Sequence, residues 1–120
     1  MHMDCKYKTL EIKYHYHDSV IKNIFIKGEM LIIYIHLYSV FYENEPEIEL
    51  CFDKITNIDK CRYWVNKLLK EFDNGENYLG ARIDEILVYK ENENLYKCFI
   101  KIDGMEKIKF KCRTVLENEN

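Results

Sequence analysis

The residues with the clearest capacity for chemistry lie together in the run His15-Tyr16-His17-Asp18. Two histidines at alternate positions of an extended strand project to the same face, as two metal ligands would. The remaining histidines, His2 and His36, have no suitable spacing to supply a third ligand. Two histidines alone make a weak metal site. One hypothesis is therefore a small metal-dependent enzyme that uses His15, His17 and Asp18.

The alternative interpretation of the same run is structural, and it is the one that we favour. His15 would lie on a solvated face, while the side chains of Asp18 and Ser19 would bind backbone amides where a strand breaks. The chain has no glycine-rich phosphate loop and no Gly-x-Ser-x-Gly sequence. We therefore predict no catalytic residue, no metal ligand and no cofactor.

The cysteines point to a reducing compartment. There are five, an odd number with no Cys-x-x-Cys pair, which is not the pattern of a disulfide framework or a zinc ribbon. We predict buried, reduced thiols and a cytoplasmic location. The longest apolar run, 30–35, is too short to span a membrane. The five are Cys5, Cys51, Cys61, Cys98 and Cys112.

Charge is segregated along the chain, although the formal net charge is only −3. Between Phe41 and Asp59 there are six acids and one base, and between Lys97 and Arg113 there are six bases and two acids. Such runs are usually solvated faces that also block aggregation at sheet edges. The alternative is a partner-binding surface, because complementary fields speed association and select partners. That surface would comprise Glu43, Glu45, Glu47, Glu49, Tyr42 and Asp53.

Exposed aromatic side chains would anchor a partner on such a surface, and we expect Tyr38, Tyr42 and Tyr63 in this role. Phe99 and Tyr89 lie between cations in the basic part of the chain, which is also a pattern for single-stranded nucleic acid. The acidic total, the scarcity of arginine and the absence of an RNP-type motif disfavour nucleic acid as a partner.

Alternating apolar residues predict about seven strands, at 7–17, 20–27, 30–42, 47–53, 83–90, 95–102 and 105–114. Gly28-Glu29 predicts a type II′ hairpin that pairs Ile26 with Leu31, Ile24 with Ile33 and Val20 with Leu37. The strand from Met30 is expected inside its sheet. A three-residue loop, 102–104, would pair Cys98 with Ile108 and Tyr96 with Phe110.

One amphipathic helix is predicted at about 57–73, with Thr56 or Asn57 as its cap and Asn74-Gly75 as its end. Its apolar stripe is Ile58, Cys61, Val65, Leu68, Leu69 and Phe72. The fold class is α+β: a curved, mostly antiparallel sheet or partly closed barrel with the helix packed against it. The chain 1–120 is read as a single domain in which 1–6 and 116–120 are frayed.

The stretch Tyr16-His17-Asp18-Ser19-Val20-Ile21, followed by an aliphatic hairpin, resembles a motif of small bacterial immunity proteins from polymorphic toxin systems. The similarity continues in Ile48-Glu49-Leu50-Cys51-Phe52 and covers about residues 10–58. It implies a non-enzymatic protein that binds and neutralises a cognate toxin. His17, Asp18 and Ser19 would be motif residues that hold the turn.

Two function classes follow from these patterns, with a third beside them. The first is a protein-binding immunity protein, whose acidic surface suits a basic nuclease toxin. The second is the small metal-dependent enzyme, and the third is a homo-oligomeric structural domain that associates through a strand edge. The sequence does not specify the oligomeric state.

Overall fold

The computed structural model describes residues 12–39, 42, 46–73, 75 and 78–119. These form one antiparallel seven-stranded sheet and one helix, which confirms the predicted α+β class. The strand order across the sheet is β6-β5-β4-β1-β2-β3-β7. The elements are β1 (Val20–Lys27), β2 (Met30–His36), β3 (Glu47–Asp53), α2 (Ile58–Glu71), β4 (Ala81–Asn92), β5 (Leu95–Ile102), β6 (Ile108–Cys112) and β7 (Thr114–Glu119).

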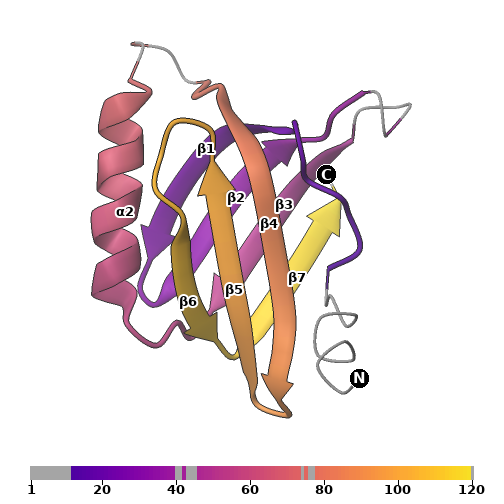
Figure 1. Ribbon diagram of the computed structural model, residues 1–120, viewed down its shortest axis with the longest axis vertical. Coiled ribbons are helices and arrows are strands. Elements are labelled where there is room, and N and C mark those ends of the chain that lie inside the picture. The colour runs from indigo at the N-terminus through magenta and orange to yellow at the C-terminus, as the bar shows by residue number, and fades with distance from the viewer. Residues whose placement is uncertain (1–11, 40–41, 43–45, 74, 76–77, 120) are drawn as a thin grey trace.

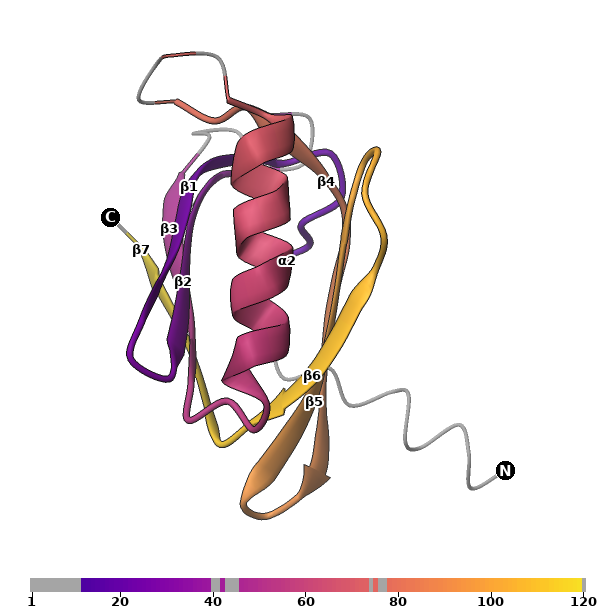
Figure 2. The ribbon, with the colours of Figure 1, turned by 90° about the vertical axis from the view of Figure 1, so that its left-hand side faces the viewer.

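The sheet is strongly bent but does not close into a barrel. We call β1, β2, β3 and β7 the first wing and β4, β5 and β6 the second wing. The wings face each other, and α2 lies along one open side between them (Figures 1 and 2). At the bend, β1 and β4 pair only through Val20 with Arg82 and Ile21 with Ala81.

The core fills the space between the inner faces of the wings. Phe52 of β3 and Phe110 of β6 meet edge to face there, with ring centroids 5.1 Å apart. Phe52 is fully buried, as are Leu50 and Ile100 on the same inner faces. Burial of such side chains is the main favourable contribution to folding. The core therefore joins the two wings more extensively than the short β1–β4 pairing does.

The β1–β2 hairpin follows the predicted register near its turn and departs from it farther away. Ile26 pairs with Leu31 and Ile24 with Ile33, and Gly28 has the positive φ, 65°, required at the first position of a type II′ turn. A bulge at Lys22 then inserts one residue. Val20 consequently lies opposite His36, so its predicted pairing with Leu37 is wrong. The bulge turns the fully buried Ile21 into the core.

β2 lies between β1 and β3, which confirms its predicted place inside the sheet. The strand ends at His36, earlier than the predicted 42.

Helix α2 buries Cys61, Trp64, Val65 and Leu68. Trp64 was missing from the predicted stripe, and its indole Nε1 donates to the backbone oxygen of Glu106 at 3.1 Å. Asn57 is the N-cap residue, as the sequence allowed, but its side chain makes no capping hydrogen bond. The helix thus owes its position to packing between the wings more than to its cap.

The β5–β6 hairpin has a different register from the predicted one, but the same faces. Cys98 pairs with Phe110 and Ile100 with Ile108, so the predicted three-residue loop is wrong. The pairing is shifted by two residues because the connection after Ile102 is longer. Since side chains alternate with period two, this shift leaves every residue on its predicted face.

Both ends of the described chain differ from the prediction. Residues 12–17 form no strand, and the rest of the strand predicted at 7–17 lies outside the described residues. The tail predicted to fray at 116–120 instead forms most of β7, which pairs along β3 from Thr114 to Glu119. The backbone hydrogen bonds of this pairing outweigh the polar composition that suggested fraying.

The four described cysteines are free and buried, as predicted for reduced thiols. Cys98 and Cys112 lie on neighbouring strands with their Sγ atoms 3.6 Å apart. Within the part of the chain that the structure describes, no helix has the length and apolar character to cross a membrane.

Replacing Phe52 with alanine should lower the free energy of unfolding by about 3 to 5 kcal/mol, because it leaves a cavity against Phe110 where the wings meet. Urea denaturation measures the loss. Tyr63→Ala is the control, since Tyr63 is 72% exposed on α2 and should change stability by less than about 0.5 kcal/mol. Equal effects of the two substitutions would contradict a core shared by both wings.

Candidate functional site

The His17-Asp18-Ser19 motif forms a tight turn at the bend between the wings. Asp18 adopts a left-handed conformation with φ of 67°, which aspartate tolerates better than most residues. Its amide donates to the carbonyl of Ile83 at 2.9 Å, and the amide of Ile83 donates to the carbonyl of Ser19 at 2.8 Å. The motif therefore extends the short β1–β4 junction by two backbone hydrogen bonds.

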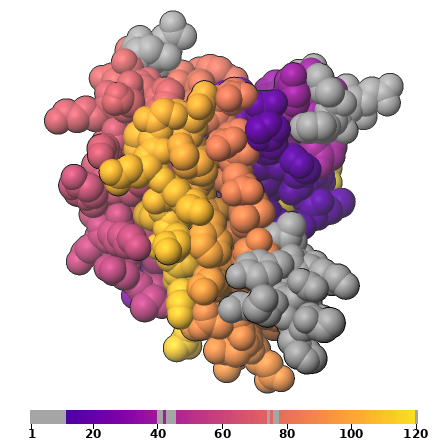
Figure 3. Space-filling view, viewed as in Figure 1, coloured from indigo at the N-terminus to yellow at the C-terminus, as the bar shows by residue number. Residues whose placement is uncertain are grey.

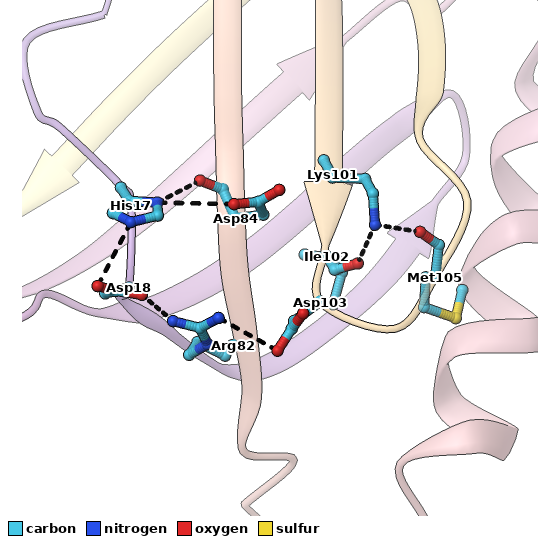
Figure 4. Close-up of polar contacts among 8 residues, drawn as sticks. All are labelled: His17, Asp18, Arg82, Asp84, Lys101, Ile102, Asp103 and Met105. Carbon is cyan, nitrogen blue, oxygen red and sulfur yellow. Dashed lines mark hydrogen bonds and ion pairs between the residues drawn. The ribbon is translucent and has the colours of Figure 1, made fainter.

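The motif's charged side chains are engaged with β4 (Figure 4). The His17 ring lies with Nδ1 2.8 Å from the backbone oxygen of Asp84 and Nε2 3.4 Å from the Asp18 carboxylate. Arg82 donates to Asp18 and also to Asp103, the latter at 3.2 Å. The Asp103 carboxylate and then Asp18 raise the pKa of Arg82 further. These four side chains join the turn, β4 and the β5–β6 loop.

Ser19 has a different role. It is fully buried, and its Oγ accepts the backbone amide of Tyr38 at 3.0 Å. The predicted binding of a backbone amide is thus confirmed for Ser19. It is wrong for Asp18, whose side chain binds the Arg82 guanidinium instead. Sequence spacing could not pair residues 18 and 82, because only the bend brings them together.

The structure adds no support to the hypothesis of a metal centre. His15 is exposed, as expected, and its ring lies 6.3 Å from that of His17. Among the described residues, no group of three or more His, Cys, Asp or Glu is arranged to hold a metal ion. A cavity of about 350 Å³ lies nearby, between residues 12–17 and β4. Its lining includes both histidines, Asp84 and Glu85.

One carboxylate holds residues 12–17 across the open side of the sheet opposite α2 (Figure 1). Glu117 of β7 accepts the Tyr16 hydroxyl at 2.5 Å and the amides of Lys13 and Tyr14 at 2.6 and 3.3 Å. Tyr16 itself is 2% exposed. Burial, followed by the hydrogen bond to Glu117, raises the pKa of Tyr16 well above its ordinary value.

Tyr42 is not the exposed anchor that the sequence suggested. It is half-buried, its hydroxyl accepts the amide of His15 at 2.8 Å, and its ring packs edge-on against Tyr14. Tyr63 is exposed but lies on α2, on the inner side of the sheet, so it is not on the same surface as the acids of β3. Glu43 and Glu45 of the predicted acidic surface lie outside the described residues.

The remaining predicted acids, Glu47, Glu49 and Asp53, alternate with buried residues along β3 and so lie on its outer face. Glu47 forms an ion pair with Lys22 at 2.8 Å. Glu49 accepts the hydroxyl of Tyr34 at 3.1 Å, and this hydrogen bond raises the pKa of Tyr34. The acids are thus held in place on the outside of the first wing.

The same outer face carries an apolar feature that the sequence analysis missed. Across four neighbouring strands, Phe25 pairs with Ile32, Ile32 with Cys51 and Cys51 with Leu116. We call these four residues the outer row. Phe25 is 36% and Leu116 52% exposed, while Ile32 and Cys51 between them are 7% exposed. The row is separate from the core cluster, to which Ile32 and Cys51 do not belong.

The sequence signal for the outer row is incomplete. Phe25 and Ile32 are apolar although they lie on the face opposite the core. Leu116, in contrast, falls in the tail predicted to fray. Recognition of β7 was therefore the missing step, because only that strand places Leu116 beside Cys51.

Comparison with protein-family models, with curated proteins and with solved structures found no match to this chain.

Replacing Ser19 with alanine should lower the free energy of unfolding by about 1 to 3 kcal/mol, because the buried amide of Tyr38 loses its acceptor. Ser39→Ala removes the same hydroxyl at an exposed position and serves as the control. Thermal or urea unfolding of both variants measures the difference. A Ser19→Ala protein as stable as its control would show that this hydrogen bond does not support the turn.

Above about pH 10, wild-type stability should fall more steeply with pH than that of Tyr16→Phe, by about 1.4 kcal/mol per pH unit. The raised pKa keeps Tyr16 neutral in the folded state, whereas unfolded tyrosine ionises near pH 10 and so favours unfolding. Below pH 10 the Tyr16 hydroxyl is protonated in both the folded and the unfolded state, so the stability difference between wild type and Tyr16→Phe does not change with pH. Urea titrations between pH 9 and 11 measure the free energy of unfolding of both proteins. If stability falls equally with pH in wild type and Tyr16→Phe, the buried Tyr16–Glu117 contact is contradicted.

Proposed function

We propose that this chain is a non-enzymatic protein-binding domain whose binding surface is the outer face of the first wing. The observation that carries this proposal is the outer row, which places Phe25 and Leu116 in solvent at either end of an apolar line across four strands. The helix lies on the inner side of the sheet (Figure 2). Contiguous apolar patches on an outer face mark interaction sites, and the four paired residues of the row are contiguous across the strands.

The surroundings of the outer row suit a protein partner. Interfaces commonly combine an apolar centre with a polar, solvent-accessible rim. Here Tyr34 and Glu49 pair beside the row, and Asp53 lies beyond Cys51 on the same face of β3. Fixed carboxylates at the rim would speed association with a basic surface and select against acidic ones. The partner is therefore expected to present an apolar patch surrounded by lysine or arginine.

Within this class we propose an immunity protein that binds and neutralises a cognate toxin in the cytoplasm. The sequence resemblance to such proteins supports it, and a basic nuclease toxin would complement Glu47, Glu49 and Asp53. The motif residues have a consistent role under this proposal, since His17, Asp18 and Ser19 are engaged within the fold. Partner contact then belongs to the outer row, and substitutions in the motif act through stability.

The direct test starts from the open reading frame directly upstream of this gene, which we expect to encode a toxin domain. Expression of that domain alone should arrest bacterial growth, and co-expression of this chain should restore it. Leu116→Lys should weaken the complex by at least about tenfold, because it places a charge where an apolar contact forms. Glu49→Lys should weaken it less at about 0.15 M salt than at low salt, since rim charges are screened.

Tyr63→Lys is the matched control, because it introduces the same charge at an exposed aromatic residue on α2, away from the outer row. Calorimetry or biolayer interferometry measures the three affinities. Equal affinity of Leu116→Lys and wild type would exclude the outer row as the interface. A concentration-dependent dimer that Leu116→Lys abolishes, without any toxin binding, would instead favour the homo-oligomeric alternative.

A further inference from the structure

The outer face of the second wing has the opposite character to that of the first. Leu87 pairs with Phe99 and Tyr89 with Lys97, so an apolar centre lies across β4 and β5. Lysines lie on the β5 and β6 side of this centre, whereas Glu85 and Glu91 flank it along β4. Figure 3 shows the face toward the viewer, over the orange and yellow strands. We call it the lysine face; its cations are Lys97, Lys107, Lys109 and Lys111.

The charges of the lysine face are poorly compensated. Lys97 lies directly opposite Lys111, an arrangement that destabilises a strand pair. Lys111 has a partner in Glu91 at 3.0 Å. Within the described part of the chain, Lys97, Lys107 and Lys109 form no ion pair with an acid. The fold therefore concentrates positive charge here and neutralises only part of it, through Glu91.

Protection of a sheet edge does not account for these lysines. Although β6 is the last strand of the second wing, α2 lies beside it (Figure 2). The amide of Thr56 donates to the carbonyl of Lys111 at 2.9 Å, so part of this edge is already paired. Lys97 is on β5, an inner strand, where no edge needs blocking. An anionic partner would account for the lysines of the edge strand β6 and for Lys97 on the inner strand β5.

We propose that the lysine face binds an acidic segment of a partner protein in an extended conformation. Alternate residues of a strand lie about 6.7 Å apart, so the side chains of Lys109 and Lys111 leave β6 at that repeat. Carboxylates at alternate positions of an extended segment have the same repeat. The apolar centre formed by Leu87, Tyr89 and Phe99 then contacts the side chains or backbone between those carboxylates.

The aromatic geometry favours a protein segment over single-stranded nucleic acid. The Lys107 Nζ lies over the Phe99 ring, 5.5 Å from its centroid. Tyr89 and Phe99 pack edge to face, at 6.0 Å and 72°. Both contacts reduce the ring surface on which a base could stack. Acidic side chains need only the ammonium groups and an apolar contact.

This site lies on a different wing from the outer row and goes beyond the proposed function, so the two can fail independently. Fluorescence anisotropy should detect binding of a labelled polyglutamate peptide to the wild-type chain at low salt. A triple variant, Lys97→Glu, Lys107→Glu and Lys109→Glu, should weaken that binding by at least about tenfold. The triple variant should fold, because Lys97→Glu replaces a repulsive pairing with Lys111 by an attractive one.

The control is a second triple variant at exposed lysines of α2: Lys60→Glu, Lys67→Glu and Lys70→Glu. It changes the net charge by the same amount as the first triple variant. It should retain peptide affinity within about twofold of wild type if location, rather than total charge, decides binding. Phe99→Leu should also retain it, since leucine preserves the apolar contact. Equal loss in both triple variants, or no peptide binding by wild type, would overturn the proposal. So would tighter binding of an oligothymidylate that Phe99→Leu abolishes, because that result identifies a stacking site for nucleic acid.

Discussion

The structure depends on one constraint: a single antiparallel sheet is bent so sharply that its two wings enclose one core, while only two residue pairs join them at β1 and β4. Such a bend leaves two open sides. Helix α2 fills one with Cys61, Trp64, Val65 and Leu68. Residues 12–19 close the other, held by the Glu117 carboxylate and by the turn at Asp18. The contacts of the His-Asp-Ser motif thereby support the closure of this side of the fold.

The same bend determines which surfaces remain for a partner. Because all inner faces are used by the core, the outer faces of the two wings are free to differ. The first wing carries an apolar row beside fixed carboxylates, and the second carries partly compensated lysines beside an aromatic centre. The small net charge of the chain is consequently a sum over two distinct surfaces.

Much of the fold was predictable from the sequence, because local periodicity and turn chemistry act over short distances. The hairpin at Gly28, the inner place of β2 and the helix near 57–73 follow from such signals. The bulge at Lys22 and the shifted β5–β6 register depend on how the wings pack, so spacing alone could not locate them. β7 was missed because its polar composition hides a strand that exists through pairing with β3.

The candidate site was predictable only in part, for the same reason. The motif could be recognised, but its partners Arg82 and Asp84 are more than sixty residues away in the chain. Tyr42 was expected outside and instead packs against Tyr14. The outer row needs four strands in register before it exists at all. Surface features built from distant strands therefore require the tertiary structure.

The most direct test maps, by methyl NMR, the surface that the proposed toxin partner contacts. Binding through the outer row should shift the methyl signals of Ile32 and Leu116 and leave that of Ile86, on the inner face near His17, unchanged. Shifts that centre on Ile86 and Ile12, beside the histidines, with Ile32 and Leu116 unaffected, would contradict it.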